Sequence, residues 1–590
     1  MAARRFHIDV TVRRMQYKKK SNRKDVEFLK VWEAAAKHEA LLQFVRNFSG
    51  VFCYGAGEYG HAVVSFLQEH KIKLQGVIVS QRESDAQEVN GLSLYEPSEI
   101  KEKLENTSYG VILSLSDKYQ PVVRETLKRY GVLQEQRIYG MMNAEMFYVL
   151  IDVFQRHSGE ILLKALFKND AMDGTLAETY EKEFQRRLAS FRQIEVQFIY
   201  MEQIGSVCYW IYHCDRIDKY GDKDVFYLFF PFTQDLYDPF LRGDGFYHAP
   251  PNQYLANKLK CDKIEVIQPD SLGFWQYCMK NHRACFNIKD GYSQIKGTEA
   301  YDKAAAAGEI NSRRAYITFT DEEIAMGERF LREIDVREWV CISARDSIYR
   351  RDVMDFQDDN LNDIDFYRNS DIVSFEQAAQ YFATQKISSF RMGAKVGNRL
   401  ASESSMIDYA RLYRTELLDV FLFSRCLFCL SDSSGIQALA SLFSRPMVQV
   451  NTSVLTTRVD SNIIADDRRD LMIMQKYWDP IRRRYLTFRD MLRYEIYGDE
   501  KIYDICAPAN TYLIYRRKGI IPVQNTPEEI VTVSQEMLQR LSGNVEYTQE
   551  DIELQERFLE IRREHEGQGN EFFNFRVGRD FLRENKWLLD

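Results

Sequence analysis

Short apolar segments alternate with helical segments along most of this chain, and this alternation limits the folds that it can adopt. Within residues 50–145, strand-like runs at 51–54, 76–79 and 111–115 are separated by helical segments. Strands that are joined through helices form parallel sheets by right-handed crossovers. The same pattern returns after residue 196 and again after residue 336. The sequence therefore predicts an α/β protein with several parallel sheets.

The length of 590 residues is too great for one hydrophobic core, so we expect several domains. Only 12 prolines occur, which leaves little room for extended linkers, and the domains are expected to abut. The predicted division is a basic tail and helix (1–49), a Rossmann-like domain (50–145), a helical connector (146–195), two Rossmann-like halves (196–335 and 336–545) and a helical tail (546–590).

Composition and charge exclude several classes of protein. The chain is 45% hydrophobic and 13% aromatic, which supports folding, and its net charge of −8 argues against general nucleic-acid binding. No apolar run reaches the roughly 18–20 residues that span a bilayer, and no secretory signal follows the first arginines. The ten cysteines are scattered, and the close pair Cys426 and Cys429 is expected on opposite faces of one strand. We expect a cytoplasmic protein.

A basic cluster lies within the first 30 residues. Such a cluster is typical of a solvated tail, and the alternative is peripheral attraction to an anionic membrane surface, here the inner membrane face. Its members are Arg13, Arg14, Lys18, Lys19, Lys20, Arg23 and Lys24.

A glycine-rich loop follows the first expected strand. Gly55, Gly57 and Gly60 form a G-x-G-x-x-G pattern between a strand and a helix, where a phosphate can meet the helix N-terminus. A dinucleotide site also needs a carboxylate at the end of the second strand. That position is Ser80, with Glu83 and Asp85 only nearby, so we expect no tight NAD site.

Polar and basic residues follow the strands expected between 336 and 455. Arg345 and Arg391 come at strand ends, and Ser433, Ser434 and Gly435 lie between a strand and a helix. Strands of one parallel sheet end at one edge, where guanidinium groups and helix-end N–H groups can hold a diphosphate. For Ser434 the alternative is an ordinary helix cap, and for each arginine a structural ion pair.

These segments resemble known families. The segments "VFCYGAGEYG", "KLQGVIVS" and "YGVILSLSDKY" resemble the small Rossmann-like domains of bacterial sugar acetyltransferases. Residues 200–455 resemble a bacterial family of GT-B glycosyltransferases encoded with surface-polysaccharide and glycoconjugate genes, with fucosyltransferase-like relatives. The ordered motifs that carry this resemblance are "ARDSIY", "YRNSDI", "RMG", "IDYA", "LDVFL" and "SSG".

The resemblance implies roles for several of these residues. Arg345 and the Ser433-Ser434-Gly435 turn would contact a nucleotide diphosphate in a donor half at 336–545, and 196–335 would be the acceptor half. Family members often carry an Arg-Ile-Gly-His loop near the first acceptor strand, where this chain has Gln203 to Ser206.

The sequence offers few catalytic or metal-binding side chains. His213 with Asp215 is the pair that fits a general base for an acceptor hydroxyl, and a structural histidine is the alternative. A metal-dependent GT-A enzyme needs an Asp-x-Asp after an apolar strand. The pairs Asp222–Asp224 and Asp363–Asp365 lack that strand, so we expect no metal.

The sequence thus predicts a metal-independent glycosyltransferase that uses a nucleotide-sugar as substrate and no other cofactor. The acceptor is expected to be a hydroxyl of a glycan, a lipid-linked glycan or a protein. The alternative is a non-catalytic nucleotide-binding, sugar-binding or scaffolding protein that uses its N-terminal domain. A third possibility, an NAD-linked oxidoreductase, requires a ribose-binding acid, and this chain has Ser80 at that position.

Overall fold

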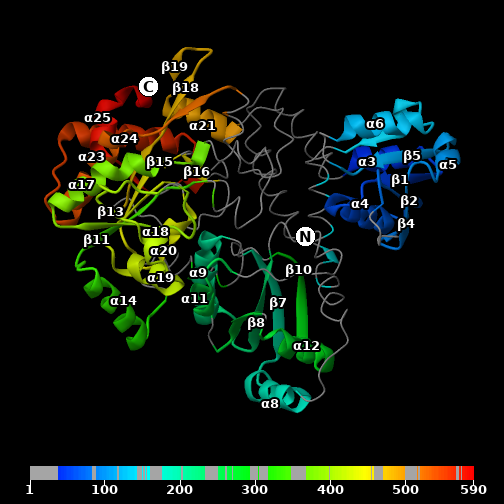
Figure 1. Ribbon diagram of the computed structural model, residues 1–590, viewed down its shortest axis with the longest axis horizontal. Helices are drawn as coiled ribbons and strands as arrows, with labels where there is room; N and C mark the ends of the chain where they lie inside the picture. The colour runs from blue at the N-terminus through cyan, green and yellow to red at the C-terminus, as the bar shows by residue number, and fades with distance from the viewer. Residues whose placement is uncertain are drawn as a thin grey trace.

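The computed structural model describes three α/β units (Figure 1), which confirms the predicted fold class. The predicted residues Glu83, Asp85, Asp363, Asp365 and Ser433 lie outside the described residues, as does the basic cluster at 13–24. The described residues are 38–82, 88–115, 119–141, 176–200, 203–232, 250–259, 262–268, 270–292, 317–346, 367–397, 399–432, 434–452, 455–457, 469–497, 518–565, 571–572 and 575–590, with single positions at 146, 149, 153, 156, 157, 159, 300, 303, 304, 348 and 515.

The first unit contains a six-stranded sheet. Its elements are α3 (Glu39–Val45), β1 (Gly50–Tyr54), α4 (Glu58–Glu69), β2 (Leu74–Ile78), β3 (Glu88–Val89), β4 (Leu92–Tyr95), α5 (Lys101–Glu105), β5 (Tyr109–Leu113), α6 (Gln120–Arg129), η2 (Glu135–Arg137) and β6 (Ile138–Gly140). The strand order is β3-β4-β2-β1-β5-β6, and β1 pairs in parallel with β2 and β5. Val51 and Cys53 enter one core, whereas Phe52 and Tyr54 enter another. Burial on both faces explains the continuous apolar run.

The second unit contains a four-stranded parallel sheet. Its elements are α8 (Ala177–Arg187), β7 (Gln193–Tyr200), α9 (Ile204–Tyr220), β8 (Val225–Phe232), α11 (Gln253–Asn257), β9 (Ile264–Val266), α12 (Leu272–Asn281), η5 (Arg283–Cys285) and β10 (Phe286–Tyr292). The strand order is β10-β7-β8-β9, so the first strand, β7, lies between β8 and β10.

The third unit contains a seven-stranded parallel sheet in the order β13-β12-β11-β14-β15-β17-β22. The order reverses between β11 and β14, which is where ligands bind in open α/β sheets. The elements are α14 (Asp321–Glu333), β11 (Trp339–Ser343), η6 (Ile372–Phe375), α17 (Glu376–Thr384), β12 (Ser388–Arg391), β13 (Met406–Ile407), α18 (Tyr409–Leu412), α19 (Glu416–Arg425), β14 (Cys429–Ser431), η7 (Gly435–Gln437), α20 (Ala438–Leu442), β15 (Met447–Thr452), β16 (Thr456–Thr457), β17 (Leu471–Met474), β18 (Lys476–Asp479), β19 (Arg484–Tyr485), α21 (Phe488–Tyr497), β20 (Ile521–Val523), α23 (Pro527–Leu541), α24 (Gln549–Arg563), β21 (Glu571–Phe572), β22 (Arg576–Val577), α25 (Arg579–Glu584) and η8 (Lys586–Leu589).

Local signals of the sequence explain some of these boundaries and miss others. Thr526 caps α23, and the Glu529 carboxylate accepts from the Thr526 backbone N–H, so the expected capping box is confirmed. The strand expected to hold both Cys426 and Cys429 begins only at Cys429, since Cys426 is the C-cap of α19 and residues 429–431 pair as β14. The two thiols therefore do not share a strand.

Two segments belong to the third unit although the sequence places them elsewhere. Helix α14 packs on α19, and Gly327 lies so close to Phe421 that a Cβ atom would come within 2.3 Å of its ring. The expected tail at 546–590 supplies β22, which pairs with β17 and completes the sheet. A two-residue strand has no apolar run that could reveal it.

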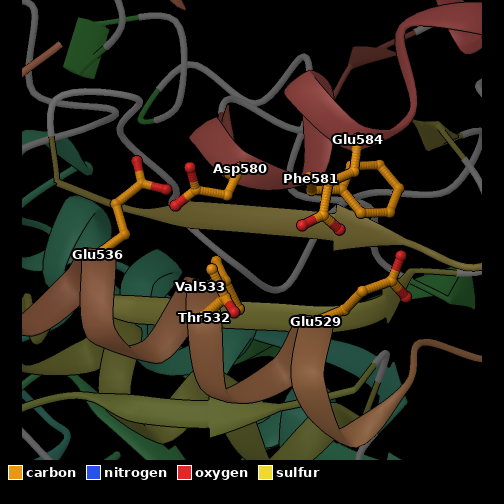
Figure 2. Close-up of a pocket in the computed structure, with 8 residues that line it drawn as sticks. Glu529, Thr532, Val533, Glu536, Asp580, Phe581 and Glu584 are labelled. Atoms are coloured by element: carbon orange, nitrogen blue, oxygen red, sulfur yellow. The ribbon is translucent and has the colours of Figure 1, made fainter.

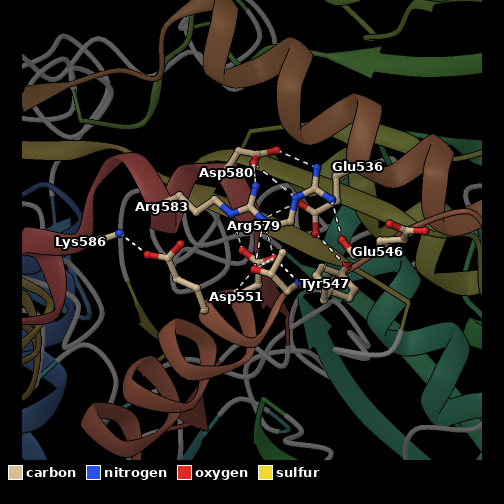
Figure 3. A network of polar contacts seen from close by, with 10 residues as sticks. Glu536, Glu546, Tyr547, Asp551, Arg579, Asp580, Arg583 and Lys586 are labelled. Carbon is tan, nitrogen blue, oxygen red and sulfur yellow. Dashed lines mark hydrogen bonds and ion pairs between the residues drawn. The ribbon is translucent and has the colours of Figure 1, made fainter.

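A polar network fixes these last helices to α23 (Figure 3). The Glu536 carboxylate accepts from the Arg579 backbone N–H at 2.7 Å and from the Tyr547 hydroxyl at 2.9 Å. Arg583 donates to Asp551 at 2.6 Å. The final helices are therefore integral to the third unit.

No helix in the described part of the chain combines the length and apolar character needed to cross a membrane.

Candidate functional site

The carboxyl edges of the second and third sheets face each other. Helix α9 begins shortly after β7 ends, and η7 begins shortly after β14 ends, so each helix start marks the carboxyl edge of its sheet. Helix α9 packs against η7 and α20, and Figure 1 shows α9 beside α20. A Cβ atom at Gly435 would lie 3.5 Å from the Gly205 backbone nitrogen. The predicted serine–glycine turn and the loop from Gln203 to Ser206 therefore meet directly.

A second contact joins the same two units beside this junction. The Asn252 side chain donates to the Glu416 carbonyl at 3.0 Å, and the Glu416 carboxylate accepts from the Tyr254 backbone N–H at 3.0 Å. Asn252 is fully buried, so these bonds are shielded from water. The two units are thereby held in one arrangement about the junction.

The loops after β11 and β14 converge as the sequence predicts. Cα pairing aligns Ser343 of β11 with Ser431 of β14. Just beyond them, the Arg345 backbone N–H donates to the Asp432 carboxylate at 2.6 Å. Arg345 thus lies beside the turn that contains Ser434 and Gly435.

Ser434 occupies the N-cap position of η7, but its side chain makes no capping hydrogen bond. Its backbone N–H donates to the Asp432 carbonyl at 2.7 Å, which tightens the turn. The ordinary capping role therefore does not explain this serine. Its hydroxyl and the N–H groups of the following turn lie at the junction of the two units.

A pocket of about 250 Å³ opens at the same edge, on the β12 side of β11. It is lined by Ala344, Asp346, Asn369, Ser370, Asp371, Ile372, Arg391 and Gln524. Ala344 and Asp346 flank Arg345, so the pocket and the Arg345 loop form one continuous region. The predicted residue Arg391 is brought into this region as well.

Arg391 is only 3% exposed, and its guanidinium lies 3.6 Å from Asp408. Burial lowers the pKa of Arg391, while the carboxylates of Asp408 and Asp346 act in the opposite direction. A buried arginine keeps its charge because its pKa starts far above neutrality. The pocket therefore contains one shielded positive charge next to carboxylates.

Side-chain hydrogen bonds hold the loops around the pocket. Asp346 accepts from the backbone N–H groups of Ile348 at 3.0 Å and of Gly397 at 2.8 Å. The Gln524 amide donates to the Asn369 carbonyl at 2.7 Å. These bonds connect segments that lie far apart in the sequence and preorganise the pocket.

Asp432 is the most buried titratable group of this region, with no exposed surface. Burial raises its pKa to about 6, against the lowering effect of the Arg345 N–H, Ser370 and the Arg345 and Arg368 charges. The ionised carboxylate therefore costs free energy in the folded protein. Because the pKa of Asp432 in the folded protein lies above the ordinary value of 3.8, the wild-type protein loses stability as the pH rises from 3.8 to about 6.

Asp432→Asn should remove this pH dependence. The amide oxygen can still accept from the Arg345 N–H, whereas the group no longer ionises. We expect the free energy of unfolding of the variant, minus that of wild type, to grow by about 1–2 kcal/mol as the pH rises from about 5 to about 8. Urea unfolding across this range measures it. A difference that stays constant with pH would show that Asp432 does not titrate there.

The predicted pair His213 and Asp215 lies on α9, away from this pocket. Residues two apart on a helix do not face each other, so the two side chains do not form a dyad. His213 is 2% exposed, and its Nδ1 has no hydrogen-bond partner among the described residues. Burial and the Arg216 charge lower its pKa to about 3, so the imidazole is neutral.

In the first unit, packing explains two of the three motif glycines. A Cβ atom at Gly55 would lie 2.8 Å from the Ser114 carbonyl oxygen, and a Cβ atom at Gly60 would lie 2.1 Å from the Gly55 carbonyl oxygen. Gly55 also has a φ of +120°. A Cβ at Gly57 would meet nothing within 4 Å, so only Gly57 faces open space that a phosphate could enter.

The end of β2 carries no carboxylate among the described residues. Ser80 instead hydrogen-bonds the Tyr54 hydroxyl at 3.0 Å. The absence of a tight NAD site stays a prediction.

A second hollow, between α23 and α25, is lined largely by carboxylates (Figure 2). Its volume of about 10 Å³ admits no more than one water molecule. Glu529 pairs with Lys476 at 2.5 Å, and Glu536 belongs to the network in Figure 3. Glu529 and Glu536 therefore bind other residues of the third unit, and a hollow of this size carries no proposal of a ligand.

Among the described residues, no group of three or more His, Cys, Asp or Glu side chains is arranged to hold a metal ion. Asp222 and Asp224 precede β8 in an exposed loop, where Asp222 pairs with Arg192 at 2.9 Å. They lie at the amino end of that strand, as expected for a solvated loop.

Some residues of the region were not assigned a role from sequence. Asp432 directly precedes the predicted serine turn, and its place as a polar residue at the end of a strand is the signal that could have identified it. Asn369, Ser370 and Asp371 fall within the "YRNSDI" motif. Gln524 reaches the pocket from more than 130 residues after Arg391, and nothing in the local sequence indicates this.

Comparison with known proteins finds no matching family model and no matching curated protein. One solved structure similar to the chain is described as the glycosyl transferase family 9 from Veillonella parvula DSM 2008. It covers 49% of this chain and 87% of its own length, at 8% sequence identity and a TM-score of 0.28. Similarity this low carries no conclusion about fold or activity.

Proposed function

We propose that this protein transfers a sugar from a nucleotide-sugar donor to a hydroxyl group of a glycan, a lipid-linked glycan or a protein. One observation carries the proposal: two parallel sheets face each other through their carboxyl edges, and Arg345, Arg391 and the Ser434 turn gather at one of these edges. Donor and acceptor could bind from opposite sides of such a junction. The sequence resemblance to GT-B glycosyltransferases supports the same assignment.

Sugar transfer from a nucleotide-sugar requires that the leaving diphosphate be stabilised. Negative charge builds on that group as the bond to the sugar breaks, and fixed donors in a region shielded from water stabilise it. Arg345 would hold the diphosphate in a bidentate manner, helped by the hydroxyl of Ser434 and the N–H groups of the Gly435 turn. Arg391 would add a buried positive charge beside the rest of the donor.

The third unit would bind the donor and the second unit the acceptor. The loop at 203–206 lies against Gly435, which is where an acceptor must meet the transferred sugar. For the general base the sequence predicts His213 and Asp215, but the two side chains do not face each other on α9. The burial of His213 leaves it no contact with an acceptor in this arrangement.

Transfer should persist in excess EDTA. The proposed site neutralises the diphosphate with guanidinium and backbone N–H groups, so chelation removes nothing that the reaction needs. The measurement is the initial rate of transfer with and without EDTA. Loss of the rate with EDTA, restored by manganese, would contradict the metal-independent GT-B mechanism.

Nucleotide-sugar binding separates this proposal from a scaffold that uses its N-terminal unit. A ligand at one hundred times its Kd stabilises the folded state by about 2.7 kcal/mol. We expect one common donor to raise the melting temperature of the full chain, and Arg345→Ala to abolish the rise. If Gly57→Val abolishes the rise in melting temperature and Arg345→Ala does not, the ligand binds in the first unit.

A further inference from the structure

The hairpin formed by β18 and β19 presents an apolar residue on a rigid tip. Asp479 pairs with Arg484 across the hairpin, and its carboxylate accepts from the backbone N–H groups of Ile481 at 2.9 Å and Arg482 at 3.0 Å. These bonds fix the turn. Ile481 is 83% exposed, the highest value among the exposed large apolar side chains of the described residues.

Three consecutive arginines, Arg482 to Arg484, follow this isoleucine, and all three are exposed. Arg482 lies 3.6 Å from Asp479, and Arg484 lies 2.7 Å from Asp490. Arg483, in the left-handed turn position with φ +54°, has no ion-pair partner among the described residues. Arg483 therefore gives the tip a positive charge that exceeds its two ion pairs, in a chain whose net charge is −8.

Aromatic side chains lie behind the tip. Trp478 contacts Tyr485 at a centroid distance of 5.1 Å, and Tyr485 contacts Trp587 at 5.4 Å. Ile521 of β20 pairs with Trp478 and is 46% exposed. Tryptophan and tyrosine with arginine and exposed isoleucine are the composition of surfaces that enter the lipid–water interface.

We propose that the β18–β19 hairpin tip, with Ile481 and Arg482 to Arg484, docks this protein on an anionic lipid surface. Charge complementarity favours this occupant, since each arginine near an anionic bilayer strengthens binding by about fivefold. A narrow convex tip offers little of the roughly 800 Å² per partner that a stable protein interface buries. A bilayer accepts such a tip because headgroups and acyl chains rearrange around it.

The position of the hairpin relates docking to the pocket. Strand β18 continues β17 beyond the carboxyl edge of the third sheet, and its partner β20 leads directly to Gln524 in the pocket wall. Docking would bring this edge near the lipid surface, as a lipid-linked acceptor requires. The docking proposal itself does not depend on sugar transfer.

The test is co-flotation of the full chain with phosphatidylcholine vesicles, with and without phosphatidylglycerol. We expect binding only with the anionic lipid, weakened by salt, because surface charges are screened. Ile481→Ser and Arg483→Glu should each lower the vesicle partition coefficient at least fivefold. Leu133→Ser and Arg337→Glu, at exposed positions elsewhere, are the matched controls and should bind as wild type.

Three results would overturn the proposal. They are no binding by wild type, equal binding to neutral vesicles, and undiminished binding by both hairpin variants. The last result would assign attachment to another surface, such as the basic cluster at 13–24. Melting curves of the variants confirm that each one is folded.

Discussion

Replacing Arg345 with alanine is expected to lower the rate of sugar transfer about a hundredfold and to leave the fold intact. One preorganised donor to a developing anion contributes roughly 3 kcal/mol to transition-state stabilisation. The fold should survive because the contact that joins the β11 and β14 loops comes from the Arg345 backbone N–H, which alanine retains.

Two further variants test which donors of the site contribute to the rate. Arg345→Lys should restore only part of the rate, because an ammonium cannot bind two phosphate oxygens in a fork. Ser434→Ala should cost less, since the backbone N–H groups of the turn remain. Measurements of kcat and of the melting temperature decide between a site role and a structural role. A lower melting temperature with unchanged turnover per folded molecule would make Arg345 a structural residue.

The largest stability effect is expected in the glycine-rich loop of the first unit. A Cβ at residue 60 would lie 2.1 Å from the Gly55 carbonyl oxygen, and backbone cannot move aside as a flexible side chain can. Gly60→Ala should therefore destabilise this unit by about 3 kcal/mol. Gly57→Ala is the matched control: its Cβ meets nothing within 4 Å, and its φ of −79° suits alanine.

Global melting does not isolate one unit of a chain with several units. Hydrogen exchange of the β1 and β5 amides reports on the first unit alone. Faster exchange in Gly60→Ala, with wild-type exchange in Gly57→Ala, is the expected result. Equal exchange in both variants would contradict the packing account of Gly60.

The sequence predicted the parts of the fold that local patterns encode. Trp339 to Ser343 reads as a buried strand and is one, and the Thr526 capping box marks the start of α23. The convergence of Arg345 with the Ser434 turn also followed from the sequence, because strands of one parallel sheet end at one edge. The diphosphate role of these residues stays a prediction.

Other features depend on contacts between distant segments, which no local pattern records. Strand β22 has two residues and gains its stability from pairing with β17. Gln524 follows β20, which pairs with β18, and its amide donates to the Asn369 carbonyl in the pocket wall. The burial of His213 follows from the packing of α9, whereas its sequence neighbours Asp215 and Arg216 are polar and indicate exposure.

The central claim is that Arg345 and the Ser434 turn bind the diphosphate of a sugar donor. The most direct measurement is donor hydrolysis by the full chain across UDP-, GDP-, CMP- and dTDP-sugars, with Arg345→Ala in parallel. We expect wild type to hydrolyse donors of one nucleotide class and Arg345→Ala to hydrolyse them about a hundredfold more slowly. Hydrolysis of none of these donors, or equal hydrolysis by wild type and Arg345→Ala, would contradict it.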